Sequence, residues 1–191
     1  MGIKLAAASG GSIELVPTNT ASNFTVTVPA VTGTMLTNKS AGTILQIVNS
    51  QTGAVATGTT QIPNDDTIPQ NTEGTEFLSL AITPTSTTSK LRIDFQLILG
   101  HTVSTAILNA CLFQDSTANA LSVAVSQNVN NGGEMIVCGS YYMTAGTTSA
   151  TTFKVRGGSP TGGTVTLNGA ASARYYGGVS NSYITITEIA A

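Results

Sequence analysis

The sequence predicts an all-β protein in which a short N-terminal β segment precedes a β-sandwich or jelly-roll-like head. Three observations support this fold class. Short runs rich in Thr, Val and Ile alternate between apolar and polar residues, clusters of Gly, Pro, Asn and Ser separate these runs, and helical periodicity is almost absent. A chain of 191 residues is long enough for one domain with a genuine core and a smaller appendage.

Residues 1–60 form the predicted N-terminal segment, with short strands over 11–16, 23–28, 43–48 and 54–62. In the second of these, Phe24, Val26 and Val28 alternate with Thr, which is the period of a half-buried strand. The first sixty residues hold few large apolar side chains, and a sheet without a second layer is marginally stable. We therefore expect identical segments of neighbouring chains to cover Phe24, Val26 and Val28, so that residues 1–60 act as a stem or an anchor.

Residues 61–75 contain two Pro, several acids and almost no large apolar side chains, which predicts a linker or a long exposed loop. Asp65, Asp66, Glu73 and Glu76 could in principle hold calcium. The spacing of a calcium-binding loop is absent, however, and exposed acids usually only solvate a loop. The solvated loop is the favoured interpretation.

Residues 76–191 form the predicted head. Its clearest strand covers 90–99, where Leu91, Phe95 and Leu99 point to one side while Arg92 and Gln96 point to the other. The runs 107–115 and 135–144 are apolar on both faces, which predicts cover by a second sheet or by a neighbouring subunit. Further strands are expected over 76–83, 122–126, 151–156, 164–167 and 183–189, enough for a two-sheet sandwich or jelly roll.

The charge and hydropathy of the chain indicate which partners are not expected. Only 8% of residues are charged, the net charge is −2 and the pI is about 5.2, so the chain has no basic field to hold phosphates and no nucleic-acid partner is expected. The mean hydropathy is +0.21, and no apolar run approaches the roughly eighteen residues of a membrane helix, so membrane insertion is not expected either.

Candidates for chemistry are few. His101 has no acid or cysteine close in sequence, so we expect a surface or turn histidine rather than a general base. Cys111 and Cys138 lie in apolar runs, and we expect small buried side chains in preference to a disulfide. Two distant cysteines and one histidine do not provide a tetrahedral metal site. The sequence therefore predicts no catalytic, cofactor or metal site.

Arg174, Tyr175 and Tyr176 are the candidate surface-recognition residues, because exposed Tyr beside Arg can stack on sugar rings or form a protein interface. Packing at the edge of the sandwich is the competing interpretation, and the absence of Trp weighs against a dedicated carbohydrate site. Tyr141 and Tyr142 are also adjacent, and on a strand only one of the two can face a given surface.

Two stretches carry a resemblance. The opening "GGSIELVPTNTASNFTVTVPAVTGTMLT", with "PAVTGT" at 29–34, resembles a segment of structural proteins of tailed bacteriophages. Residues 151–191 are similar to the closing part of phage fibre and virion-surface head domains: a "KVR" strand, a turn at Asn168 and Gly169, an "RYYGG" phrase and a final "ITITEI" strand. The resemblance implies an intertwined homotrimer on the virion surface, with a β-rich stem and a jelly-roll-like head, and it adds no catalytic residue.

The expected function is therefore architectural and non-enzymatic. The first hypothesis is a homotrimeric capsid decoration, or cement, protein that contacts the major capsid protein and stabilises the shell. The alternative is a short tail fibre, bound to tail proteins, whose Arg174 region contacts a host surface glycan. A hydrolytic tailspike would need paired acids in a groove, and no such pair is expected.

Overall fold

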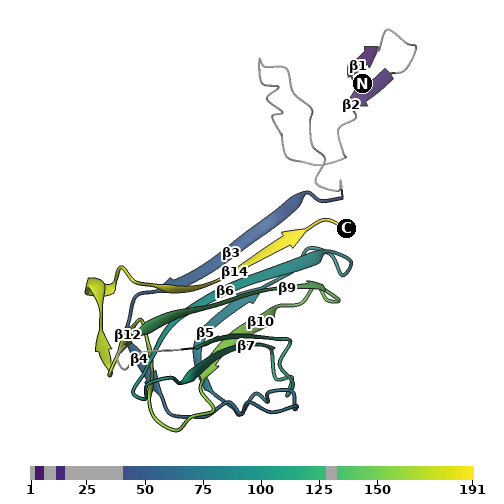
Figure 1. Ribbon diagram of the computed structural model, residues 1–191. Helices are drawn as coiled ribbons and strands as arrows, with labels where there is room; N and C mark the ends of the chain where they lie inside the picture. The colour runs from purple at the N-terminus through teal and green to yellow at the C-terminus, as the bar shows by residue number, and fades with distance from the viewer. Residues whose placement is uncertain (1–2, 7–11, 16–40, 128–132) are drawn as a thin grey trace. The chain divides into compact units, whose positions relative to one another are not determined.

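The computed structural model describes residues 3–6, 12–15, 41–127 and 133–191 (Figure 1). The chain divides into two compact units, Met1–Met35 and Leu36–Ala191. In the first unit, β1 (Ile3–Ala6) pairs with β2 (Ser12–Leu15) in an antiparallel hairpin. The predicted stem residues Phe24, Val26 and Val28 lie outside the described residues, so their role stays a prediction.

The second unit is an all-β, jelly-roll-like sandwich, which confirms the predicted fold class. In its larger sheet, β6 (Lys90–His101) is bonded along one edge to β9 (Glu134–Thr144) and along the other to β14 (Ser182–Ile189) and then β11 (Val165–Leu167). Outside these lie β3 (Ile44–Thr52) on β14 and β4 (Ala56–Gly58) on β11. The smaller sheet has the order β5 (Thr75–Ile82), β10 (Thr151–Gly158), β7 (Ile107–Gln114) and β8 (Ser122–Gln127). All pairs are antiparallel, and Figure 1 shows the two layers.

The core lies between the two sheets. On β6 the expected alternation holds, because Leu91, Phe95 and Leu99 are buried while Lys90 and Arg92 are exposed. Fully burying one such side chain stabilises the fold by about 1.5–3 kcal/mol. β10 and β14 contribute the same inward alternation, so residues from both sheets interdigitate in one hydrophobic cluster.

The head begins earlier in the chain than the sequence indicated. The structure places the boundary between Met35 and Leu36, whereas the expected N-terminal segment ran to residue 60. β3 belongs to the head because it pairs with the last strand, Thr52 opposite Ser182 and Ile47 opposite Thr187. A local alternation reveals a strand, but it does not reveal a partner at the other end of the chain.

Residues 61–75 form a loop that is mostly exposed, as one of the two interpretations expected, but it is anchored to the head at Ile62 and at its end. Ile62 is buried against Cys111 and Phe113 on the outer side of the smaller sheet. Arg156 fixes the end of the loop, since its Nε donates to the carbonyl of Glu73 and its Nη2 to the carbonyl of Gly74, each at 2.7 Å. The loop therefore covers a second, smaller cluster.

The loop of residues 168–181, here called the tip loop, precedes β14. It contains the short strands β12 (Gly169–Ala170) and β13 (Ala173–Arg174) and the 3₁₀ turn η1 (Tyr176–Gly178). β14 starts beside Thr52 and ends beside Ile44, so the tip loop and residue 41 lie at opposite ends of the larger sheet (Figure 1). None of the described residues forms a helix long and apolar enough to cross a membrane.

Candidate functional site

The outward face of the larger sheet carries large apolar side chains in solvent. Ile44, Ile47, Ile136 and Tyr142, which we call the apolar face, are each 57–58% exposed. Directly paired residues project to the same side of a sheet. Ile47 faces Thr187, Thr187 faces Arg92 and Arg92 faces Tyr142, so one row crosses four strands. Thr187 and Arg92 lie between Ile47 and Tyr142 in this row, and Ile136 pairs with Ile98 further along β6. Several large apolar side chains exposed on one side of a sheet make that side a candidate interaction surface.

Arg92 and Asp94 on this face pair with each other, whereas Lys90, on the same side of β6, donates from Nζ to Oγ1 of Thr144. Nε of Arg92 lies 2.8 Å from Oδ2 of Asp94, and the Arg92 guanidinium lies over the ring of Tyr142 at 5.8 Å from its centroid. A shallow hollow of about 540 Å³ lies beside this pair, lined also by Cys138 and Tyr183. The face therefore combines apolar side chains with one internal ion pair, which suits contact with a surface of similar character.

The two cysteines have different environments. Cys111 is buried as expected, and burial raises the pKa of its thiol to about 12. The prediction that Cys138 is buried was wrong, because it is exposed on the larger sheet. It pairs with Gln96, an outward residue of β6, and the pairing register therefore turns Cys138 outward as well. Both thiols are free.

The tip loop brings the predicted recognition residues together. Arg174, Tyr175 and Tyr176 are all exposed, and the two rings form an edge-to-face pair with centroids 6.2 Å apart. Val179, further along the same loop, is also exposed. Tyr175 and Tyr176 lie outside any strand, and the backbone has a positive φ of 51° at Tyr176. The expectation that adjacent strand residues point to opposite faces therefore does not apply to these two tyrosines. That expectation does hold for Tyr142, which is exposed, and Tyr141, which packs on the core.

Asn168 fixes the base of the tip loop. It is fully buried with φ of 54°, a left-handed conformation that Asn tolerates better than most residues. Its Nδ2 donates to the carbonyls of Thr52 (2.8 Å) and Ala54 (3.0 Å), and its Oδ1 accepts from Oγ of Ser182 (2.8 Å). These bonds tie the loop to the end of β3 and the start of β14.

His101 is not the surface histidine that the sequence suggested. It is fully buried at the end of β6, where it pairs with Val165 of β11. Its Nδ1 accepts from the backbone N–H of Val103 at 2.9 Å, while its Nε2 has no hydrogen-bond partner among the described residues. No described acid or cysteine contacts it by a hydrogen bond, so the geometry resembles a structural histidine rather than a general base.

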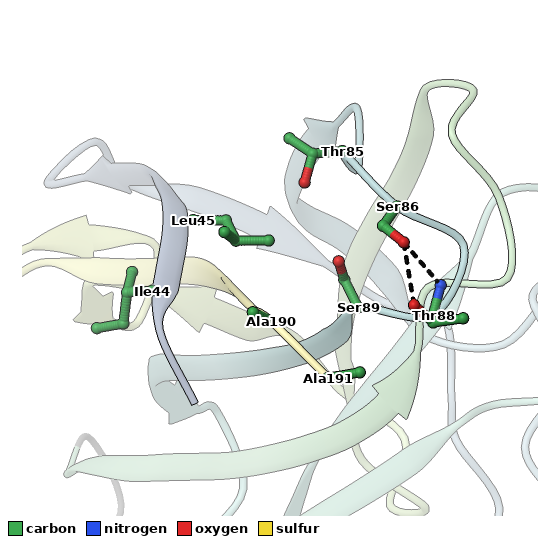
Figure 2. Close-up of a pocket in the computed structure, with 8 residues that line it drawn as sticks. All are labelled: Ile44, Leu45, Thr85, Ser86, Thr88, Ser89, Ala190 and Ala191. Atoms are coloured by element: carbon green, nitrogen blue, oxygen red, sulfur yellow. Dashed lines mark hydrogen bonds between the residues drawn. The ribbon is translucent and has the colours of Figure 1, made fainter. Parts of the chain in front are cut away.

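A second hollow lies at the end of the head near residue 41 (Figure 2). Its volume is about 480 Å³, and Figure 2 shows strand-end residues such as Ile44 and Ala190 on one side and hydroxyl residues of the 83–89 loop on the other. Oγ of Ser86 lies 3.0 Å from Oγ1 of Thr88. The lining offers hydroxyls and methyl groups but no titratable side chain.

Three of the four acids considered for calcium are engaged locally, since Oε2 of Glu73 accepts from the backbone N–H of Gln70 at 3.0 Å and the other two are Asp65 and Glu76. Asp65 accepts from the backbone N–H of Thr67 at 2.8 Å, and Glu76 lies 3.6 Å from Nζ of Lys154. Within the described ranges, no group of three or more His, Cys, Asp and Glu side chains is placed to hold a metal ion.

Sequence reasoning missed Ile44, Ile47 and Ile136 as surface residues. The signal for Ile136 was present, because the run 135–144 is apolar on both faces and neighbour cover was one expected explanation. For Ile44 and Ile47 the local sequence holds no such signal, because their orientation depends on pairing with the last strand of the chain.

The comparisons with known proteins identify no family. The sequence matches no family model, and no curated protein matches it significantly. Among solved structures, Eiger TNF from S. frugiperda is similar over 75% of this chain and 93% of its own, with 9% identity and a TM-score of 0.43. The infectious bursal disease virus Gx strain structure is similar over 96% of this chain and 48% of its own (12% identity, TM-score 0.38). The enzymatically active domain of tailspike protein 4 from bacteriophage CBA120 is similar over 78% of this chain and 21% of its own (16% identity, TM-score 0.28).

Proposed function

We propose that this chain is a non-enzymatic structural protein of a tailed-phage virion, and specifically a homotrimeric decoration protein on the particle surface. The observation that carries the proposal is the apolar face, four large side chains more than half exposed on one side of the larger sheet. The head already has a filled core on the other side of that sheet. The exposed row therefore contributes to assembly rather than to the fold of one chain.

The occupant that best fits this face is a second copy of the same chain. A face with apolar side chains and an internally paired Arg92 and Asp94 presents no unmatched charge at that pair. Closed symmetry is the usual arrangement for identical chains. The number three and the virion location come from the resemblance of residues 10–37 and 151–191 to phage structural proteins. A trimer seated across capsomer junctions would stabilise the shell by burying surface.

The double substitution I47D and I136D tests the apolar face. We expect sedimentation to show a monomer with an unchanged circular dichroism spectrum, because two buried carboxylates would oppose contact. V125D is the matched control, since Val125 is 62% exposed but lies on β8 in the smaller sheet. A wild-type monomer, or equal dissociation by V125D, would refute the role of the face.

The thiol of Cys138 gives an independent readout of the same face. In the wild-type oligomer it should react slowly with a thiol reagent, and in the I47D and I136D variant it should react quickly. Cys111 should stay unreactive in both while the head is folded, because it is buried. Rapid labelling of Cys138 in a confirmed oligomer would place the interface elsewhere.

The stem requires its own test because Phe24, Val26 and Val28 lie outside the described residues. Replacing Val26 and Val28 with Asp should weaken or break the trimer while the head remains folded. An unchanged trimer by sedimentation would count against the shared stem without affecting the apolar face.

A short tail fibre is the second candidate, and the position of the tip loop favours it. The tip loop exposes Arg174, Tyr175 and Tyr176 at the end of the larger sheet opposite residue 41, which suits contact with a host surface glycan. Copy number in purified particles separates the two roles, since a decoration protein is present in many copies and a fibre in few. Incubation with host polysaccharide should release no oligosaccharide in either case.

A further inference from the structure

We propose that neighbouring copies of this chain join edge to edge through their larger sheets, so that β3 of one copy pairs with β9 of the next. This inference rests on the proposed self-association through the apolar face, and it deepens that proposal by naming the strands that meet. The contact continues the larger sheet into the next copy and leaves the fold of the head unchanged.

The larger sheet ends in two strands that each pair on one side. Along the order β3, β14, β6 and β9, the pairing of the described residues leaves one side of β3 and one side of β9 without a strand (Figure 1). An edge directs backbone N–H and C=O groups away from the sheet, which makes it a template for another strand. β3 has no charged residue and β9 has only Glu134, so neither edge carries the Lys or Pro that commonly protects one.

The strand directions allow these two edges to meet. β3 is antiparallel to β14, β14 to β6 and β6 to β9, so β3 and β9 run in opposite directions. A rotation about an axis along the strands preserves these directions, and β9 of a second copy would therefore lie antiparallel to β3. The lengths also suit each other, because β3 has 9 residues and β9 has 11.

The two ends of each outward row match in character. Three rows cross the sheet: Ile47, Thr187, Arg92 and Tyr142; Asn49, Thr185, Asp94 and Ser140; and Gln51, Tyr183, Gln96 and Cys138. The first and last residues of all three rows are exposed. When each row continues into the next copy, the neighbours across the joint are Ile47 and Tyr142, Asn49 and Ser140, and Gln51 and Cys138. One apolar pair and two uncharged pairs result, and no like charges oppose each other.

A second copy is the partner that satisfies both edges with one kind of contact. A strand from a different protein would cover β3 and leave β9 open, whereas the head-to-tail contact gives each edge the strand that it lacks. Head-to-tail contacts repeat around a cyclic axis, which agrees with the proposed trimer. Pairing of β3 with β3 of another copy would instead end at a dimer and leave both β9 edges free.

Disulfide trapping in the full-length protein tests the contact. Q51C places a thiol at one end of the row that ends in the native Cys138. Within one chain these two positions are three strand spacings apart, about 14 Å, whereas a disulfide needs Cα atoms about 4.4–6.8 Å apart. A disulfide between them therefore forms only between copies. Paired residues of adjacent antiparallel strands, with Cα atoms about 4.5–5.5 Å apart, lie within that range.

Mild oxidation with diamide, followed by non-reducing gel electrophoresis, is the measurement. We expect Q51C to give bands at multiples of the 19.4 kDa chain that disappear on reduction, and we expect wild type to give none. S50C is the matched control, because Ser50 is the neighbouring residue on β3 but pairs with the buried Ile184 and faces the core side. S50C, and the double variant Q51C and C138S, should remain single chains.

The outcomes separate this inference from the proposed function. An oligomer by sedimentation without a disulfide in Q51C would overturn the edge contact alone. A covalent dimer of wild type, or of the Q51C and C138S variant, would indicate contact between like strands and would also overturn it. Trapping of S50C as efficient as that of Q51C would show that the link does not follow the outward row. A wild-type monomer by sedimentation would instead refute the self-association on which this inference rests.

Discussion

Replacement of Asn168 tests how the tip loop is held. N168A removes three hydrogen bonds, to Thr52, Ala54 and Ser182, and places Ala at φ of 54°. A net loss of about 1 kcal/mol for each bond and about 1 kcal/mol for Ala in the left-handed region gives an expected destabilisation of about 4 kcal/mol. N168G loses the same bonds without the backbone penalty, so it should cost about 3 kcal/mol.

Urea denaturation followed by far-UV circular dichroism measures both variants, at one chain concentration because an oligomer unfolds in a concentration-dependent way. Hydrogen exchange at residues 168–181 should rise in both, since the loop loses its anchor to β3 and β14. The reasoning fails if N168A costs less than about 1 kcal/mol, which would be within the range of a single surface hydrogen bond. It also fails if N168G is less stable than N168A, because the two differ only at the backbone.

Three further results are expected. Burial raises the pKa of the fully buried Glu188, but the hydrogen bonds that its carboxylate accepts, including those from Gln46 and Thr85, lower the pKa by more than burial raises it. The pKa of Glu188 in the folded state therefore lies below the ordinary value of 4.5. The carboxylate therefore stabilises the fold above about pH 4.5, and this contribution is lost as the pH falls through the folded-state pKa, so E188Q should flatten the acid-side fall in the free energy of unfolding. G53A should cost about 1–3 kcal/mol in urea denaturation, whereas G162A, whose added Cβ meets nothing closer than 3.8 Å, should stay within about 0.5 kcal/mol. Raising NaCl from about 0.05 to about 1 M should leave the sedimentation of the oligomer nearly unchanged, and dissociation by salt would contradict an apolar interface.

The strands of the sandwich were predictable because each carries its own evidence. The alternation of Leu91, Phe95 and Leu99 with polar residues defines β6 and its buried face without reference to any other segment. The same holds for the final strand, where Ile184 and Ile186 alternate with Thr and are fully buried. Periodicity is a local property, so a single sequence is enough to find it.

The properties that were missed depend on pairing. Cys138 lies between Val137 and Gly139, and a run that is apolar on both faces does not say which residues point inward. Its orientation is fixed only by its register against Gln96 on β6. His101 lies just after the predicted strand 90–99. It is buried because β11, from residues more than sixty positions later, pairs with it through Val165. Long-range register decides both environments.

The edge strand β3 connects these observations to assembly. Edge strands of monomeric proteins are commonly protected by Lys, Pro or bulges that prevent other strands from adding to them. β3 pairs only with β14 among the described residues, and its sequence ILQIVNSQT has no charged residue, although the pairing register shifts between Gln46 and Ile44. It also contributes Ile44 and Ile47 to the apolar face. With 8% charged residues in the whole chain, few like charges oppose close approach of another copy. An uncharged edge strand beside exposed apolar side chains favours association of a monomer with other chains. The proposed contact with a second copy would cover both features.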